Sequence, residues 1–489
     1  MACSLGPILE GRAPLAANTK DINFASKSAQ YRWMRAPNKI TMPHYRGLRN
    51  HVRLWLRRNL VPLPPDTDFS VQTWLSNTSY SMARKEELLK SEKDVLTRQD
   101  YNNKSFGKSE FYPTYKFIRW INSRTDAFKV FSGPYFKRIE EELFKLPVFI
   151  KHVPVVDRAA YLHEKLGTFT HLCVTDHTSF EAAMNVKIMS IVEFQLYKYM
   201  LRNLNNYDQV ISVLHEAICN KQRCFYRNTN GLVYAKSEAR MSGDMCTSLG
   251  NGFTNYMVMD YIAKIKNWGQ LVGVVEGDDG IFGISGQVPV KQDFADVGFD
   301  VKLDEFTSVG EAGFCHLYNT EDEFENLVDP NSIMLKLGWT MSPQMNGGDK
   351  VKRALLYAKA LSCICECPAN PITSKFALRV IEQLGPQNLK DTIVDDQWWY
   401  EQVVCTRIKD CIHRAKIGPS LKQRAFVENK WDISVGNQLL LEKSFETIDV
   451  LSEIPSHLVE LLSWTDYPHS SYSYYHYIVD KKIGESSSI

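Results

Sequence analysis

The sequence lacks long apolar runs. None of its 489 residues lie in a stretch that approaches the roughly 18 uninterrupted hydrophobic residues typical of a transmembrane helix. Residues 1–16 also lack a basic start followed by an apolar core, so we expect no secretory signal there. With 44% hydrophobic and 23% charged residues, the composition is that of a globular protein and excludes collagen-like, coiled-coil and wholly disordered chains.

Cysteine is sparse, with 11 residues scattered along the chain. This excludes a disulfide framework and fits a reducing compartment such as the cytosol. The closest group is Cys363, Cys365 and Cys367. A zinc site would need a fourth ligand and a different spacing, so we interpret these three as small buried residues in a helical stretch.

Net charge is also small, at +2, but its distribution is uneven. Residues 1–60 hold 11 Lys or Arg against Glu10 and Asp21, an excess of +9. Such an arm either contacts a polyanion or packs over the body of the protein as a strap. We favour the strap because apolar residues interleave with the charges and look like packing anchors: Trp33, Met34, Tyr45, Leu48, Val52, Leu54 and Trp55.

Hydrophobic periodicity predicts a mixture of helices and strands. We expect strands at 149–156 and 171–176, and hairpins at 223–237 and 271–284. The expected helical segments are 81–96, 187–218, 244–264, 352–367 and 374–384.

Three aspartates stand at strand ends or turns in apolar surroundings. Asp176 ends one expected strand, and Asp278 and Asp279 lie in the turn Glu276-Gly-Asp-Asp-Gly280. Adjacent carboxylates repel each other, and a divalent cation with oxygen ligands relieves the repulsion. If Asp176 faces the turn, the three could hold two metals about 3.5–4 Å apart. Gly-Asp-Asp-Gly alone is equally consistent with a simple hairpin linker.

A polar motif lies between these acids, running from Ser242 to Asn251. Ser242-Gly243 permits a flexible loop ahead of a helix. Thr247 and Asn251 are four residues apart, so they share one helical face and present two hydrogen-bonding groups together. An ordinary polar helix surface would show the same pattern.

Together the motifs Asp-x4-Glu (Asp176 to Glu181), Ser-Gly-x3-Thr-x3-Asn and Gly-Asp-Asp resemble motifs A, B and C of the RNA-dependent RNA polymerases of positive-strand RNA viruses. The sequence around Asp176 is similar to that of tombusvirus-like polymerases, within the supergroup that includes flavivirus-like enzymes. The resemblance spans about residues 120–370.

The resemblance implies an α+β fold shaped as a right hand, with fingers, an antiparallel RRM-like palm sheet and a mostly helical thumb, closed by an N-terminal fingertip extension. It implies the following division: 1–100 as extension and fingertips, 101–170 as fingers, 171–181 as palm, 182–239 as fingers, 240–335 as palm, and 336–489 as thumb and C-terminal tail.

For the site, the resemblance implies that Asp176, Asp278 and Asp279 hold two Mg²⁺ or Mn²⁺ ions during nucleotide transfer to an RNA 3′-hydroxyl. Glu181 and Asn251 would recognise the ribose 2′-hydroxyl. Many relatives have Asp where Glu181 stands, and the longer side chain shifts the reach of the carboxylate. The remaining nucleotide contacts would come from Ser242, Gly243 and Thr247.

Weaker motifs add further residues. Lys151 and Arg158, in a stretch that resembles motif F, would line the triphosphate channel, or else be an exposed lysine and a surface ion pair. Lys302, in a motif D-like segment, would protonate the leaving pyrophosphate, or else be a solvated lysine. Template and primer contacts would come from residues that resemble motifs G and E: Ser132, Gly133, Pro134, Phe314 and Cys315. Cys315 would act by packing and not as a nucleophile.

The expected function is therefore RNA-directed RNA synthesis from NTPs on a viral genome template. The expected partners are template and nascent RNA, NTPs, a membrane-anchored viral replication protein and host factors, in cytoplasmic membrane-associated replication complexes. A reverse transcriptase-like polymerase and a non-catalytic viral RNA-binding protein are the alternatives. Reverse transcriptases usually carry an aromatic residue before x-Asp-Asp, which this chain lacks. A non-catalytic binding protein would leave the three aspartates unexplained. A helicase is disfavoured because no Gly-x4-Gly-Lys-Ser/Thr motif occurs.

Overall fold

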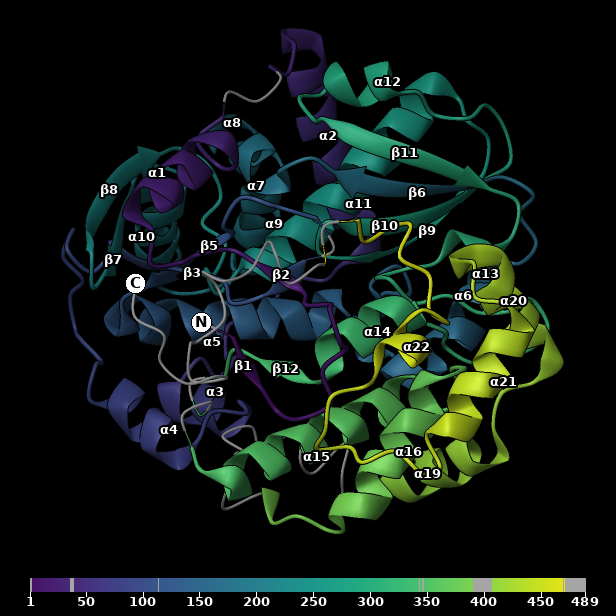
Figure 1. Ribbon diagram of the computed structural model, residues 1–489. Coiled ribbons are helices and arrows are strands. Elements are labelled where there is room, and N and C mark those ends of the chain that lie inside the picture. Colours follow the sequence, from purple (N-terminus) through teal and green to yellow (C-terminus); the bar gives the residue numbers. More distant parts are fainter. Residues whose placement is uncertain are drawn as a thin grey trace.

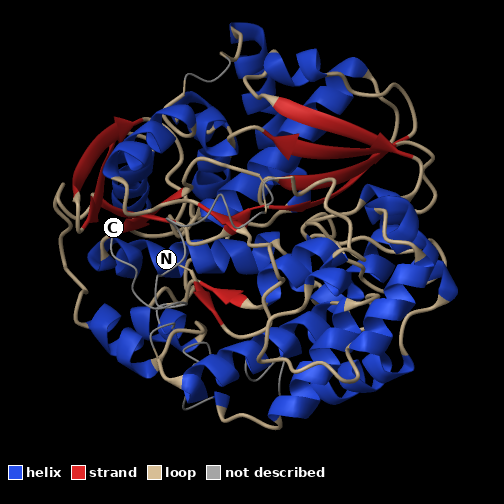
Figure 2. Ribbon diagram, in the orientation of Figure 1, coloured by secondary structure: helices blue, strands red, loops and turns tan. Residues whose placement is uncertain are grey.

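The computed structural model describes residues 2–35, 39–112, 114–342, 344, 347–389, 407–468 and 470. It contains helices and strands in a mixed α+β arrangement (Figure 2). No helix in this described part is long and apolar enough to cross a membrane. The C-terminal tail from residue 468, which is rich in Ser and Tyr, lies outside the described residues apart from residues 468 and 470.

A four-stranded antiparallel sheet carries the candidate site, in the order β11-β6-β10-β9 (Figure 1). Its strands are β6 (Leu172–His177), β9 (Leu271–Glu276), β10 (Asp279–Ile284) and β11 (Val301–Phe306). Side chains alternate between the two faces, as the pleat of a strand requires. Val275 and Phe282 join the cluster around helix α11 (Thr247–Lys266), and Val274 and Ile281 join the cluster of α6 (Arg158–Leu166) and α13 (Val309–Ala312). Both faces are thus covered by helices.

A second four-stranded sheet lies on the other side of the molecule, in the order β5-β3-β7-β8 (Figure 1). Its strands are β3 (Asn103–Gly107), β5 (Trp120–Arg124), β7 (Gln222–Asn228) and β8 (Gly231–Ser237). Strands β3 and β7 are parallel, and the other pairs are antiparallel. Helix α1 (Ile22–Tyr31) packs against β8. The helices that lie between β5 and β7 in the chain include α5 (Asp126–Leu143), α8 (Val186–Ile191), α9 (Glu193–Met200) and α10 (Tyr207–Ile218).

The C-terminal third is mostly helical, as the periodicity predicts, and forms a separate hydrophobic cluster below the first sheet in Figure 1. Its elements are α14 (Pro330–Leu337), β12 (Trp339–Thr340), α15 (Asp349–Glu366), α16 (Thr373–Leu384), α19 (Ile408–Ile417), α20 (Leu421–Trp431), α21 (Val435–Ser444) and α22 (Ser456–Val459). Cys363, Cys365 and Cys367 lie at the end of α15. Among the described residues, no three His, Cys, Asp or Glu side chains are gathered closely enough to hold a metal ion as they stand.

The N-terminal arm packs over the rest of the chain, in agreement with the strap interpretation. Strand β1 (Cys3–Ser4) pairs with β12, and Leu5 and Leu9 enter the C-terminal cluster. Helix α2 (Met42–Asn59) buries Leu48 and Val52 in the large central cluster. Of the proposed anchors, Met34 and Leu54 are instead exposed. The remaining short elements are β2 (Leu15–Ala16), α3 (Val71–Ser76), α4 (Met82–Leu89), β4 (Phe111–Tyr112), α7 (Phe180–Ala183) and α12 (Lys291–Ala295).

Some sequence predictions need correction. The expected strand at 149–156 is wrong: two 3₁₀ turns, Ile150–His152 and Val155–Asp157, occupy it. Pro154 between them lacks the backbone donor that a ladder needs. The expected helix at 81–96 is confirmed only as α4, and the helix expected from residue 244 begins at Thr247. Both hairpins and the strand at 171–176 are confirmed.

Candidate functional site

The three aspartates meet at one end of the first sheet. Asp176 lies near the end of β6, and Asp278 and Asp279 follow β9 in the turn to β10. Gly280 pairs with Thr175, so the next antiparallel step brings Asp279 beside Asp176. Gly277 has a φ of +62°, a left-handed conformation that favours glycine and lets the turn form. All three aspartates are exposed.

These carboxylates have no ion-pair partner among the described lysines and arginines. Although Asp279 is exposed, surrounding protein atoms partly desolvate its carboxylate, and this desolvation, followed by the nearby Asp278 carboxylate, raises the pKa of Asp279 to about 6. Asp176 raises the pKa of Asp279 by a smaller amount, whereas His316 and the Cys315 thiol lower it. The end of the sheet is therefore a site of concentrated, unpaired negative charge.

These residues fit a divalent cation by the chemistry of their donors. Mg²⁺ and Mn²⁺ prefer carboxylate oxygens, and a cation would relieve the repulsion between adjacent aspartates. The described side chains are not already gathered into a three-ligand cluster. The aspartate side chains are exposed, so water and substrate oxygens could complete the coordination sphere.

A buried amide holds the aspartate turn in place. Asn255 on α11 donates from Nδ2 to the carbonyl oxygens of Gly277, at 3.3 Å, and Asp278, at 3.0 Å. Its Oδ1 accepts from His177 Nε2 at 3.3 Å. Burial lowers the pKa of His177 to about 4, so the ring is neutral at neutral pH. Asn255 thus connects the end of β6 to the turn after β9, a role that the sequence motifs did not indicate.

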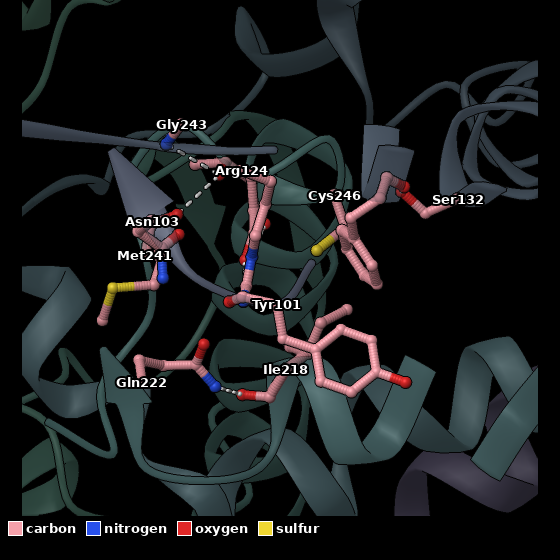
Figure 3. Close-up of polar contacts among 12 residues, drawn as sticks. Tyr101, Asn103, Arg124, Ser132, Ile218, Gln222, Met241, Gly243 and Cys246 are labelled. Atoms are coloured by element: carbon pink, nitrogen blue, oxygen red, sulfur yellow. Dashed lines mark hydrogen bonds and ion pairs between the residues drawn. The ribbon is translucent and has the colours of Figure 1, made fainter. Parts of the chain in front are cut away.

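The loop before α11 is held by two buried ion pairs. Figure 3 shows Arg124, a partner in one of them, together with Met241, Gly243 and Cys246 of the loop. Asp244 accepts two bonds from Arg124 of β5, at 2.6 and 2.9 Å, with both side chains almost completely buried. Arg124 also donates to the Tyr101 carbonyl at 2.7 Å. Arg240, at the start of the loop, pairs with the buried Glu193 of α9. The expected flexible loop therefore has a firmly anchored base.

Within that loop, Thr247 stabilises the Ser-Gly turn. Its hydroxyl accepts from Gly243 N at 3.3 Å and donates to the Met241 carbonyl at 3.2 Å. The Ser242 carbonyl accepts from Asn122 N at 2.6 Å. Gly243 has a φ of +116°, and a side chain there would press on β5. Thr247 therefore holds the shape of the loop. Ser242 contacts β5 through its backbone carbonyl, so its side-chain hydroxyl is available to bind a ligand.

The two expected ribose-binding residues lie on either side of this loop. The Glu181 carbonyl accepts from Arg240 N at 3.1 Å, which places α7 against the loop. Asn251 lies one turn into α11 and is buried, and its Oδ1 has no hydrogen-bond partner in the described part of the chain. A buried acceptor without a partner is costly, so this oxygen is suited to a hydroxyl donor from a ligand.

The two residues expected to line the triphosphate channel each donate a hydrogen bond to another side chain of the protein. Arg158 donates from Nη1 to Glu276 Oε2 at 2.6 Å, directly before the aspartate turn. Lys151 donates from Nζ to the Ser248 hydroxyl of α11 at 2.6 Å. Both cations thus lie beside the motifs that they are expected to serve.

Lys302 lies opposite Asp176 in the β11–β6 register, but its ammonium pairs with Asp304 at 2.7 Å. That hydrogen bond raises the pKa of Lys302. Cys315 places its sulfur 3.7 Å from Asp279 Oδ2, and burial raises the pKa of its thiol, which disfavours the nucleophilic thiolate form. Phe314 is buried beside it.

The expected template contact at Ser132, Gly133 and Pro134 needs correction. These residues are buried inside α5 and offer RNA no surface. The Ser132 hydroxyl donates to the Phe128 carbonyl at 2.8 Å, and the Trp74 ring occupies the space next to Gly133. We leave these three residues out of the site.

Comparison with known proteins agrees with the motifs. The profile of a family described as viral RNA-dependent RNA polymerase matches residues 56–451. This match covers most of the sequence, and the chain belongs to that family. It is also similar to the RNA-directed RNA polymerase of Panicum mosaic virus (strain United States/Kansas 109S), with 26% identity over 231 residues. That alignment covers 44% of this chain and 22% of the relative, so the chain matches about a fifth of the relative's length.

Proposed function

We propose that the chain is an RNA-directed RNA polymerase that copies a viral positive-strand genome. The observation that carries this proposal is that Asp176 of β6 lies beside the turn that holds Asp278 and Asp279, with no lysine or arginine paired to any of the three among the described residues. Family membership supports it. Template RNA, nascent RNA and NTPs are the corresponding partners.

The right-hand description follows from this proposal. The β11-β6-β10-β9 sheet would be the palm, within the expected ranges 171–181 and 240–335. Residues 101–170 and 182–239, which contain the β5-β3-β7-β8 sheet, would be the fingers. The helices within 336–489 would be the thumb, and residues 1–100 the extension that connects fingers to thumb. The pairing of β1 with β12 supports that last assignment.

In this mechanism, Asp176 and Asp278 would hold two Mg²⁺ or Mn²⁺ ions, with Asp279 as a weaker ligand. Such ions lower the pKa of the attacking 3′-hydroxyl and neutralise the leaving pyrophosphate. Asn255 keeps the turn, and hence Asp278, in register with β6. Arg158 and Lys151 offset triphosphate charge, and Lys302 supplies a proton to pyrophosphate once released from Asp304.

Sugar selection would depend on two hydrogen-bond acceptors. Glu181 and Asn251 Oδ1 can each accept from a ribose 2′-hydroxyl, a donor that deoxyribose lacks. Ser242 would contact the sugar, while Gly243 and Thr247 keep the loop in shape. Phe314 and Cys315 would support the primer end near the sheet.

The test is incorporation of labelled ribonucleotides by the purified protein on RNA and DNA templates, with and without a primer. The proposal expects a product complementary to RNA that requires Mg²⁺ or Mn²⁺. Preference for a DNA product would favour a reverse transcriptase instead, and RNA binding without synthesis would favour a non-catalytic protein.

Attachment to membranes, in cytoplasmic replication complexes, would come from a membrane-anchored replication protein. Membrane floatation of the chain with and without that partner tests this attachment.

A further inference from the structure

The segment after α1, from Arg32 to Arg35, reaches the candidate sugar site from the N-terminal arm. We propose that Arg32 is a positioning residue for ribose selection, which holds the Glu181 carboxylate in its working orientation. This inference rests on the proposed function, because it assigns a task to Arg32 in the same reaction. It makes the N-terminal arm part of the substrate site and not only a structural strap.

The contact itself is direct. Arg32 Nη2 lies 3.4 Å from Glu181 Oε1, and the two side chains are 23% and 18% exposed. No other hydrogen bond to this carboxylate occurs among the residues that the structure describes. Oε2 therefore keeps its capacity to accept from a hydroxyl while the guanidinium restrains the carboxylate through Oε1.

The segment that carries Arg32 is fixed on both sides of it. Trp33 is 3% exposed and packs on Trp120, in a cluster that also contains Met241, the residue before the Ser-Gly turn. Arg35 Nη2 pairs with Asp300 Oδ2 at 2.8 Å, immediately before β11. Because its neighbours are anchored to the loop and to the sheet, Arg32 is held where it can orient Glu181.

A glutamate needs such a partner more than an aspartate does. Its extra methylene adds a rotatable bond, and ordering that bond costs conformational entropy. A guanidinium contact already present in the free protein reduces the ordering that remains when a ribonucleotide binds. A 2′-deoxynucleotide offers no hydroxyl to Glu181, so it gains little from this orientation. Loss of Arg32 should therefore affect ribonucleotides selectively.

The experiment compares kcat/KM for a ribonucleotide and its 2′-deoxy analogue. Arg32→Ala should lower the ratio of the two values roughly fivefold, about the effect of one neutral hydrogen bond. Arg32→Lys should restore part of the ratio, since it keeps the charge and one donor. The matched control is Arg46→Ala, which removes an exposed arginine of the same arm on α2 and should leave the ratio unchanged.

A double-mutant cycle tests whether Arg32 acts through Glu181. In a Glu181→Ala background, which removes both acceptor oxygens, Arg32→Ala should cause no further change in the ratio. Melting-temperature shifts with ATP and 2′-deoxy-ATP give the same comparison without turnover. An unchanged ratio in folded Arg32→Ala, or an equal loss for both sugars, overturns the proposal.

The results distinguish failure of the polymerase function, failure of the sugar site and failure of the Arg32 role. A wild-type protein that makes no RNA and binds neither nucleotide overturns the polymerase function, and the role of Arg32 with it. A wild-type protein that makes RNA while Glu181→Ala keeps the wild-type ratio overturns the sugar-site assignment, and the role of Arg32 with it, but not the polymerase function. If Glu181→Ala lowers the ratio and Arg32→Ala does not, only the positioning role of Arg32 fails.

Discussion

Acidic side chains occur in two regions around the candidate site, and their partners differ. In the loop before α11, Asp244 is paired with Arg124, and Arg240 is paired with Glu193 on a neighbouring helix. In the turn after β9, Asp278 and Asp279 are exposed and have no guanidinium or ammonium partner among the described residues. The first region is complete as a structure, whereas the second leaves its negative charge available for the cation that the proposed function requires. Under that proposal, the same residue type serves stability in one place and chemistry in the other.

The largest expected effect concerns the turn. Asp278→Asn should reduce nucleotide incorporation to background and leave the fold near wild-type, because an amide replaces a charged ligand of the same size. Single-nucleotide extension and circular dichroism measure the two properties. The control is Asp322→Asn, which removes an exposed carboxylate that pairs with Lys422. Near-normal synthesis by a folded Asp278→Asn protein would remove the catalytic role.

A mutation in the loop before α11 should reduce stability, whereas the mutation in the turn should reduce activity and leave the fold intact. Arg124→Ala leaves the Asp244 carboxylate buried without its partner, so it should lower the free energy of unfolding by about 3–5 kcal/mol. Arg84→Ala is the matched comparison, because Arg84 forms a similar pair with Asp126 that is about one-third exposed. That pair should contribute about 1 kcal/mol or less. Chemical denaturation measures both, and equal losses would contradict the distinction.

A smaller effect is expected where the two regions are connected. Asn255→Ala removes the bonds from α11 to the Gly277 and Asp278 carbonyls. Displacement of the turn should lower kcat about tenfold, with a smaller change in KM, because misplaced reacting groups raise the barrier. Steady-state kinetics on a fixed template measure this split. An increase in KM alone would indicate that Asn255 serves binding and not the placement of Asp278.

The smallest expected effect concerns sugar choice. Asn251→Ala removes the buried Oδ1 that lacks a partner. The preference for ribonucleotides should fall several-fold, since one hydrogen bond to a neutral group contributes about 1 kcal/mol. The ratio of kcat/KM for the two sugars is the measurement. An unchanged ratio would exclude Asn251 from selectivity.

The sequence predicted the turn better than the loop, for physical reasons. Asp278 and Asp279 lie in a short hairpin between apolar strands, a local pattern that a single stretch reveals. The ion pair of Arg124 and Asp244 joins residues that are 120 positions apart in the sequence. The residues around either one do not indicate which partner it has. The resemblance of Ser132-Gly133-Pro134 to motif G rests on three residues, and so short a match does not reveal that all three are buried inside α5, with the Trp74 ring next to Gly133.

The most direct test of the central claim is calorimetric titration of the purified protein with Mg²⁺ or Mn²⁺. If the turn requires an external cation, the wild-type protein should bind the ion and the Asp176→Asn/Asp278→Asn double variant should bind it much more weakly. Binding should also raise the melting temperature of the wild type alone, as linkage requires. Equal binding by both folded proteins would contradict the account.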